Sequence, residues 1–181
     1  PDWYTETRYR LEQALNDALS VIDQVADEFK NKFGRYSGGL LEEYRLEDAE
    51  TAVVSMGSVV GTIKDVVDEL RDAGKKIGVL KIRTFRPFPK KAIYDALKDV
   101  KNVVVIEKDI SLGFGGMLSN ELKTAFYHQP KQPKISGFVA GLGGRDIPQQ
   151  SIRKTIEKGV SEVIDTGWVD LREDIIGGKF L

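Results

Sequence analysis

The feature that most constrains this chain is a change of apolar periodicity between Thr51 and Pro89. Thr51 to Met56 is a β-branched apolar run, and it is followed by apolar residues at helical spacing up to Leu70. A second short apolar run, Ile77 to Ile82, follows the helix-ending Gly74. Two strands joined by a helix of this length must be parallel, with a right-handed crossover. The sequence therefore predicts an α/β fold.

The remaining periodic segments extend this pattern into a mixed sheet. Leu41 to Leu46 has only a short link to the strand at Thr51, so it pairs antiparallel to its neighbour or lies elsewhere. The prediction is a mostly parallel five-stranded sheet with one antiparallel strand. The other elements predicted are a long helix from about Thr5 to Phe33, helices at Lys90–Leu97, Met117–Tyr127 and Gln149–Val163, and strands at Val103–Ile106 and Ile135–Ala140. In the helix from Gln149, Ile152, Ile156, Val160 and Val163 are expected to face inward, with Asp146 as a cap and Pro148 in the first turn.

Three regions are predicted along the chain. Residues 1–40 form a long linker helix and a loop, and residues 41–165 form the α/β domain. At ~1.5 Å per residue the first helix would be roughly 40 Å long, more than one domain needs for a covering helix. Residues 166–181 form an apolar tail without clear periodicity, ending in Phe180 and Leu181, and it is expected to dock on a surface.

Composition narrows the range of partners. The chain has 41% hydrophobic and 30% charged residues, as is ordinary for a globular protein. Its formal net charge of -1 produces no electrostatic field that would attract nucleic acid or acidic lipid. It has no cysteine, which excludes a disulfide and a thiolate-held iron-sulfur cluster and agrees with a cytoplasmic location. No apolar run is long enough for a membrane span. Since the sequence starts with Pro1 instead of Met, we expect processing or a longer parent polypeptide.

The candidate sites lie after the predicted strands, because ligands of parallel sheets gather beyond the carboxyl ends of the strands. These ends carry Gly57-Ser58, Arg83 to Arg86, Glu107 to Gly116 and Gly141 to Asp146. No G-x-G-x-x-G or G-x-x-x-x-G-K-[ST] is present. For Gly57-Ser58, a tight turn with Ser58 as helix cap is favoured over a phosphate-binding turn. The loops Gly113 to Gly116 and Gly141 to Gly144 are compact turns or, less favoured, anion nests.

Two short segments are candidates for an interface or a local structural role. Arg86, Pro87, Phe88 and Pro89 form a stiff corner, because each proline fixes its own φ and restricts the preceding residue. Such stiffness suits a docking surface as well as an ordinary corner between a strand and a helix. The other segment is Gly143, Gly144, Arg145 and Asp146, in which Arg145, held by the neighbouring carboxylate, would place a fixed positive charge at a subunit boundary. The alternative is an exposed ion pair.

No catalytic constellation can be assembled from the sequence. His128 has no Ser, Cys or Asp partner at a recognisable spacing and is interpreted as a surface or capping residue. The acids Glu42-Glu43, Asp95 and Asp99 are interpreted as solvated faces. Arg83 lies where an NADP-binding domain places a basic residue, but the triple glycine is missing.

Three motifs in order resemble a known family. They are AETAVVSMGSVVGTIKDVVDELRDAGKKIGVLKIRTFRPFP, NVVVIEKDISLGFGG and GFVAGLGGRDIP. Together they resemble the C-terminal portion of α subunits of the 2-oxoacid:ferredoxin oxidoreductase family, over nearly the whole chain. The RPFP segment favours the pyruvate branch of the family over the 2-oxoglutarate branch.

The resemblance implies a transketolase C-terminal-like domain, a three-layer α/β/α sandwich. It implies a reaction in which pyruvate, CoA and oxidised ferredoxin give acetyl-CoA, CO2 and reduced ferredoxin. The complete enzymes of the family use thiamine diphosphate, Mg²⁺ and iron-sulfur clusters, with CoA as a substrate. None of these cofactors is expected on this chain, and no catalytic residue of the family can be assigned to one of its positions. The expected partners are other domains and subunits of a hetero-oligomer, and ferredoxin through that complex.

The hypothesis is therefore a structural and assembly domain that is inactive alone. One alternative is a CoA- or nucleotide-phosphate-binding module in which Arg83, Arg86 and Arg145 contact phosphates. Another is the same domain of an enzyme for 2-oxoglutarate or branched-chain 2-oxoacids. A stand-alone enzyme ranks last, because no pair of nucleophile and base is present.

Overall fold

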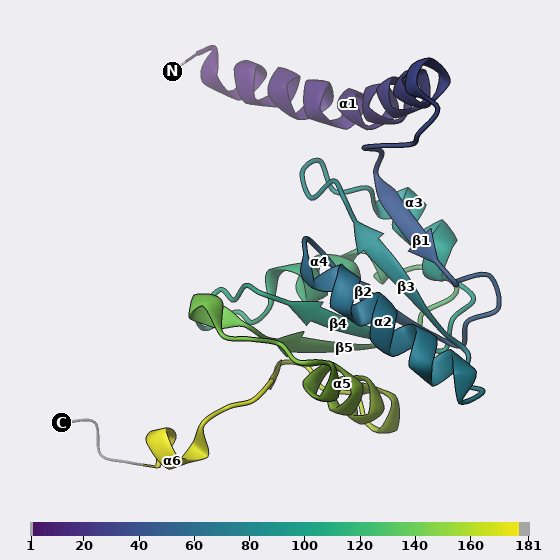
Figure 1. The fold of residues 1–181 in the computed structure, drawn as a ribbon. Coiled ribbons are helices and arrows are strands. Elements are labelled where there is room, and N and C mark those ends of the chain that lie inside the picture. The colour runs from purple at the N-terminus through teal and green to yellow at the C-terminus, as the bar shows by residue number, and fades with distance from the viewer. Residues whose placement is uncertain (1, 178–181) are drawn as a thin grey trace.

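A computed structural model describes residues 2–177 of the chain (Figure 1). Phe180 and Leu181 of the predicted docking tail lie outside the described residues. The helices are α1 (Tyr4–Phe33), α2 (Val59–Asp72), α3 (Lys90–Leu97), α4 (Met117–Phe126), α5 (Gln149–Ser161) and α6 (Glu173–Ile176), with a 3₁₀ turn η1 (Leu142–Gly144). The strands are β1 (Leu41–Tyr44), β2 (Thr51–Ser55), β3 (Ile77–Ile82), β4 (Asn102–Glu107), β5 (Lys134–Val139) and β6 (Gly167–Trp168).

The strands form one mixed sheet in the order β1-β3-β2-β4-β5-β6. Among the strands of residues 2–177 only β1 is antiparallel to its neighbour, with Leu41 opposite Ile82. The predicted antiparallel strand is thus confirmed, but the predicted number of five strands was wrong, because the tail supplies a sixth. Strand β6 pairs with the end of β5, and the Val169 amide donates a hydrogen bond of 2.9 Å to the Val139 carbonyl. A two-residue strand is too short to show a period of two in the sequence.

The sheet is the middle of three layers. Strand β2 is buried at all five positions, and β4 and β5 at five of their six, as expected for central strands covered on both faces. Side chains of one face, including Val53, Val104 and Phe138, pack with those of α2 and α5. On the other face, residues such as Val54 and Val105 pack with α3 and α4. The expected α/β/α sandwich is confirmed.

Helix α5 departs from the prediction at its C-terminal end. Ile152 and Ile156 are fully buried, whereas Val160 and Val163 are 43% and 60% exposed. The inward position is occupied by Gly159, where a Cβ would lie 2.9 Å from Val104 Cγ2, so Val160 is turned outward. The helix ends at Ser161, and Val163 therefore lies beyond the inward-facing stripe.

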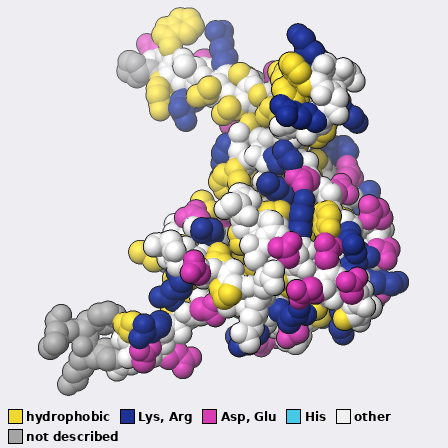
Figure 2. Space-filling model, in the orientation of Figure 1, with side chains coloured by type: hydrophobic (Ala, Val, Ile, Leu, Met, Phe, Trp, Pro, Cys, Tyr) yellow, Lys and Arg dark blue, Asp and Glu magenta, His cyan; other side chains and the backbone are white. Residues whose placement is uncertain are grey.

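Helix α1 extends away from the sandwich (Figure 1). It ends at Gly34, whose φ of +70° is the left-handed conformation typical of a helix end. Its C-terminal half contacts the domain through buried Ala26 and through Asp23, which accepts a hydrogen bond from the Leu40 amide. The N-terminal half is exposed, including Leu11 and Leu15, and apolar side chains are visible along the helix in Figure 2. None of the described helices is long and apolar enough to cross a membrane.

An ion-pair network attaches the antiparallel edge strand to the sandwich. Glu42 on β1 accepts hydrogen bonds from Lys64 of α2 and from Arg83, which follows β3. The interpretation of Glu42 as a merely solvated acid was wrong, because its side chain is only 28% exposed. The hydrogen bond from Lys64, more than the one from Arg83, lowers the pKa of the Glu42 carboxyl below its ordinary value of 4.5.

We predict that Glu42→Gln lowers the free energy of unfolding by about 1 kcal/mol at neutral pH. Because the folded-state pKa is depressed, this stabilisation is present above the ordinary pKa and is lost as pH falls through the folded-state value. Urea unfolding in steps from neutral to acidic pH measures it. Glu43→Gln, on the exposed side of the same strand, is the control. An equal loss for both variants would contradict the prediction.

Candidate functional site

Four strand ends meet at one edge of the sheet. Strands β2, β3, β4 and β5 are mutually parallel, so their carboxyl ends lie together as predicted. Two adjoining hollows lie there and share Ser58 and Lys108. The apolar groove has a volume of about 460 Å³ and is lined mainly by Met56, Phe85, Glu107, Met117 and Leu118. The charged hollow has about 610 Å³ and is lined by Lys108, Thr62 and the segment 144–148.

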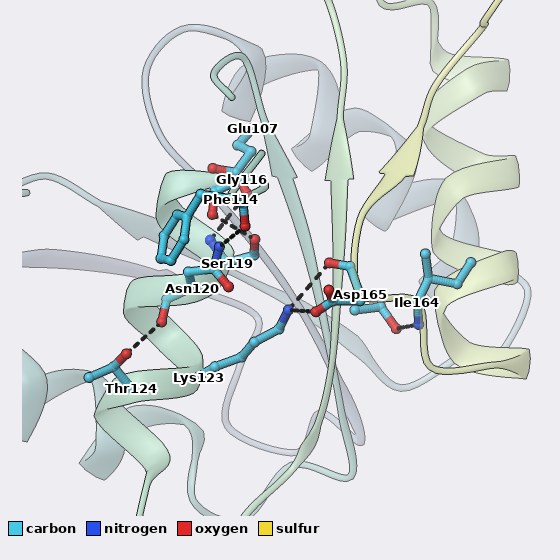
Figure 3. A network of polar contacts seen from close by, with 10 residues as sticks. Glu107, Phe114, Gly116, Ser119, Asn120, Lys123, Thr124, Ile164 and Asp165 are labelled. Carbon is cyan, nitrogen blue, oxygen red and sulfur yellow. Dashed lines mark hydrogen bonds and ion pairs between the residues drawn. The ribbon is translucent and has the colours of Figure 1, made fainter. Parts of the chain in front are cut away.

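Glu107 fixes the geometry of this edge (Figure 3). Its side chain is buried at the end of β4, and its carboxylate accepts backbone hydrogen bonds from Leu118 at 2.6 Å and Ser119 at 3.1 Å. These amides belong to the first turn of α4, where the backbone N–H groups have no partner within the helix. A Cβ at Gly116 would collide with the carboxylate, so only glycine fits there. Glu107 is thus the side-chain cap of α4.

The loop between β4 and α4 is well braced and apolar at its tip. The Ser111 and Gly115 amides each donate a 2.9 Å hydrogen bond to the carbonyl of the other residue, forming a bridge. Asn120 Nδ2 on α4 donates a hydrogen bond of 3.1 Å to the Phe114 carbonyl. Between these contacts Leu112 is 86% exposed and Phe114 64% exposed. The loop that was predicted to be a compact glycine-rich turn therefore exposes two large apolar side chains, Leu112 and Phe114, to solvent.

The Arg86 to Pro89 corner lies beside the apolar groove. The Arg86 guanidinium packs 4.2 Å from the centroid of the Phe85 ring and pairs with Glu121 on α4 at 2.5 Å. Pro89 is buried and directly precedes α3. The corner therefore connects the end of β3 to α3 and, through Glu121, to α4.

The segment from Gly143 to Asp146 forms the wall of the charged hollow. Gly143 and Gly144 are exposed and have φ values of +65° and +83°, which side-chain-bearing residues rarely adopt. Arg145 was expected to be held by Asp146, and this was wrong. Its Nη1 instead donates a 2.6 Å hydrogen bond to the Asp170 carbonyl, because the tail passes alongside. Asp146 does not cap α5, whose N-cap position is Pro148.

The remaining candidates do not assemble into a reactive centre. Gly57 has the positive φ of a tight turn, while Ser58 is at the N-cap of α2 without the predicted side-chain hydrogen bond. His128 is exposed, and its ring lies tilted against that of the adjacent Tyr127, with 4.0 Å between ring centroids. Asp95 pairs with Lys91 on its own helix and with Lys98 directly after the helix end. Within residues 2–177 no group of three or more acidic or histidine side chains is placed to hold a metal ion.

A third hollow, of about 700 Å³, lies at the opposite edge of the sheet between α2 and α5. It is lined by residues such as Gly74, Asn102 and Val160, none of which is a candidate from the sequence. We place the candidate site at the carboxyl ends of the strands, where ligands of parallel sheets gather. The glycine-rich turns at these ends expose backbone N–H groups instead of side chains.

Sequence reasoning missed the two most informative features of this edge. Glu107 was noted only as the residue that ends a strand, and Leu112 and Phe114 were not singled out. The one signal in the sequence was that an acidic residue, Glu107, directly follows the predicted strand and precedes Leu118 by eleven residues. A separation of eleven residues between an acid and a helix start does not by itself indicate a helix cap.

We predict that Glu107→Ala lowers the free energy of unfolding by about 2 kcal/mol, since it removes a cap and two charge-assisted hydrogen bonds. Urea unfolding measures the loss, and hydrogen exchange should accelerate at the Leu118 and Ser119 amides. Glu107→Gln keeps one acceptor oxygen and should lose less. Glu157→Ala on the exposed surface of α5 is the control. Unchanged exchange at both amides would show that Glu107 is not the cap.

Comparison with known proteins identifies relatives of the whole chain. Residues 49–152 match the family described as pyruvate:ferredoxin oxidoreductase core domain II. The chain is 47% identical to pyruvate synthase subunit PorA of Methanosarcina barkeri over 97% of its length, and 47% identical to that of Methanocaldococcus jannaschii over 96%. It is 37% identical to ketoisovalerate oxidoreductase subunit VorA of Pyrococcus horikoshii over 94%. The chain spans 45%, 44% and 43% of these relatives, less than half of each.

Two solved structures share the fold. A 2-oxoglutarate:ferredoxin oxidoreductase from Magnetococcus marinus, with 2-oxoglutarate, coenzyme A and succinyl-CoA bound, has a TM-score of 0.52 at 16% identity. The match covers 74% of this chain and 21% of that one. A split-gene transketolase, described as an inactive β4 tetramer, has a TM-score of 0.51 at 12% identity and covers 66% and 41%. At these identities the likeness supports the transketolase-like fold alone.

Proposed function

The chain belongs to the 2-oxoacid:ferredoxin oxidoreductase family, and from this premise we propose that it is the structural and assembly domain of a subunit of a pyruvate:ferredoxin oxidoreductase. The observation that carries the proposal is the strand-end edge. Its loop between β4 and α4 is braced and exposes two large apolar side chains, yet the described residues bring together no nucleophile with a base. An edge of this kind suits contact with another protein surface better than chemistry.

The proposed reaction of the complete enzyme converts pyruvate, CoA and oxidised ferredoxin into acetyl-CoA, CO2 and reduced ferredoxin. Thiamine diphosphate, Mg²⁺ and iron-sulfur clusters would supply the decarboxylation and the electron transfer. The chain lacks cysteine, so its residues do not fit a thiolate-held cluster. We place these groups in other parts of a hetero-oligomer. Ferredoxin as a partner through that complex and a cytoplasmic location stay predictions.

The interface candidates from the sequence lie in two separate segments. Arg86, Pro87, Phe88 and Pro89 follow Phe85, which lines the apolar groove, and Pro89 itself lines another hollow together with Leu19 and Leu40. Gly144, Arg145 and Asp146 line the charged hollow, and Gly143 directly precedes them. Through its contacts with Phe85 and Glu121, Arg86 orients a corner whose neighbours are half-buried. We propose that both segments contact other domains or subunits. The division into linker helix, α/β domain and tail remains part of this proposal.

The substrate is proposed as pyruvate on the basis of the PorA relatives. A branched-chain 2-oxoacid enzyme is the second candidate, since a relative of similar coverage is named for ketoisovalerate. A CoA- or nucleotide-binding module remains an alternative, because Lys108 and Arg145 both line the charged hollow.

We predict that Arg86→Ala in the complete enzyme weakens subunit assembly, since it frees the corner from α4. Sedimentation velocity and pyruvate-dependent ferredoxin reduction measure the effect, and a several-fold loss of assembled enzyme is expected. Arg153→Ala is the matched control. Arg153 also pairs with a glutamate, Glu69, but on the surface of α2 and α5. If sedimentation and rate are unchanged in Arg86→Ala, the corner has no interface role.

We predict that calorimetric titration of the chain with CoA, and then with thiamine diphosphate and Mg²⁺, gives no saturable heat. Circular dichroism of the same sample establishes that the chain is folded. Saturable CoA binding that disappears in Arg145→Ala would instead support the ligand-binding alternative, with the charged hollow as its site.

A further inference from the structure

The first part of the tail is attached to the edge of the sheet, and the rest extends away from it (Figure 1). We call residues 164–170 the strap. The Gly137 amide of β5 donates a 2.9 Å hydrogen bond to the Ile164 carbonyl, and β6 then pairs with the end of β5. Residues 171–177, which include α6, are all exposed. The strap is therefore the attached part of the tail.

The strap lies in a closely fitted seat. A Cβ at Gly167 would lie 2.6 Å from Phe138 Cδ1, and one at Gly137 would lie 2.9 Å from the Asp165 carbonyl oxygen. Glycine at both positions lets the strap approach the sheet more closely than a side chain would permit. Lys123 on α4 donates a 3.3 Å hydrogen bond to the same carbonyl and pairs with the Asp165 carboxylate (Figure 3). The position of the strap is thus set by shape and by charge.

The middle of the strap braces the loop between β4 and α4. Thr166 Oγ1 lies so close to Gly115 that a Cβ there would be 2.7 Å away. Gly115 forms the bridge with Ser111 that closes this loop. The tip of the loop carries the exposed Leu112 and Phe114, which we call the strand-end tip. The strap therefore supports the loop that presents the strand-end tip.

The end of the strap is held by Arg145, whose Nη1 donates the 2.6 Å hydrogen bond to the Asp170 carbonyl. Arg145 lines the charged hollow, and it also lines a smaller hollow of about 160 Å³ that Trp168 and Val169 of the strap help to form. The loop between β4 and α4 and the wall of the charged hollow are thus in contact with one continuous stretch of chain.

The strap buries little apolar surface. No residue from 162 to 177 is buried, whereas five of the six residues of the neighbouring β5 are. Ile164 and Val169 of the strap pack against the core, and both are only partly buried. Segments with few buried apolar contacts open locally at a lower free energy than the core unfolds. The strap can therefore leave β5 while the sandwich stays folded.

We propose that the strap switches between a closed and an open state and that Arg145 is its latch. In the closed state Thr166 supports Gly115, and the Asp170 carbonyl binds Arg145. In the open state both contacts are lost together, because they belong to one stretch of chain. The loop that carries the strand-end tip then loosens, and the Arg145 guanidinium is released toward the charged hollow.

The switch links two separate surfaces of the molecule. A neighbour that binds the exposed apolar residues of α6 and draws the tail away opens the strap, and the strand-end tip loses its support. The strap is then the two-state element that coupling between distant sites requires. This consequence rests on the assembly role proposed above, whereas the strap itself is a property of the chain.

Amide hydrogen exchange of the full chain tests the switch. Arg145→Ala removes a hydrogen bond from a charged donor, so exchange at the Val169 amide should accelerate by about tenfold. The Ser111 and Gly115 amides, which close the loop bridge, should accelerate by a similar factor, because they open with the strap. Arg145→Lys keeps a charged donor and should restore part of the protection at all three amides.

Two control variants separate the switch from other effects. Arg172→Ala removes an exposed arginine that pairs with Asp174 beyond the strap, and it should leave the three amides unchanged. Ile93→Val destabilises the core on the face of the sheet opposite to Ile164 and Val169. It should accelerate exchange in the central strands but not at the three amides. Circular dichroism verifies that each variant is folded.

Gly167→Val tests the seat directly, since its side chain collides with the Phe138 ring and keeps the strap open. Overpacking of this kind should accelerate exchange at Val169 by about tenfold or more, and at Ser111 and Gly115 by the same factor.

Two results overturn the inference. Unchanged exchange at Val169 in Arg145→Ala would show that Arg145 is not the latch. Faster exchange at Val169 in either variant, without a change at Ser111 and Gly115, would show that the strap does not support the loop. The assembly role is tested separately by the Arg86→Ala enzyme, so either proposal can fail while the other stands.

Discussion

The structure depends on the burial of its central parallel strands on both faces. Strands β2, β4 and β5 are almost entirely buried, so α2 and α5 must cover one face and α3 and α4 the other. Once both faces are covered, only the sheet edges and the strand ends remain available for contacts. Parallel pairing then brings the carboxyl ends of β2 to β5 to a single edge, where the two hollows lie.

Glu107 links the buried strand β4 to the surface loop that leads to α4. Among the described residues it is the only charged side chain that is buried, and the α4 amides are its partners. Burial of a carboxylate is tolerable only because those N–H groups replace its lost water. The same contact excludes a side chain at Gly116 and sets the direction in which the loop leaves β4. The exposure of Leu112 and Phe114 is thus a consequence of a buried interaction.

Apolar side chains remain uncovered at several places on the described chain, among them helix α1, the strand-end tip, and the segment from Trp168 to Ile176. They lie on separate parts of the molecule, at the two ends and at the strand-end edge (Figure 1). Clusters of exposed large apolar side chains are typical of sites that contact another protein surface. The proposed assembly role would account for these surfaces, and relatives more than twice as long offer room for such neighbours.

The regular spacing of apolar residues determined most of the fold. A helix or strand with a buried face needs an apolar residue at each inward position, and these positions recur at a fixed interval in the sequence. Bounds such as Ile77–Ile82 and Lys90–Leu97 were predictable to the residue. Features without a repeat were decided by tertiary structure alone. Strand β6 exists because β5 offers a free edge, Arg145 binds the Asp170 carbonyl because the tail passes there, and Glu107 caps α4 because the loop returns to β4. Each joins residues whose separation carries no periodic signal, and only the folded backbone brings them together.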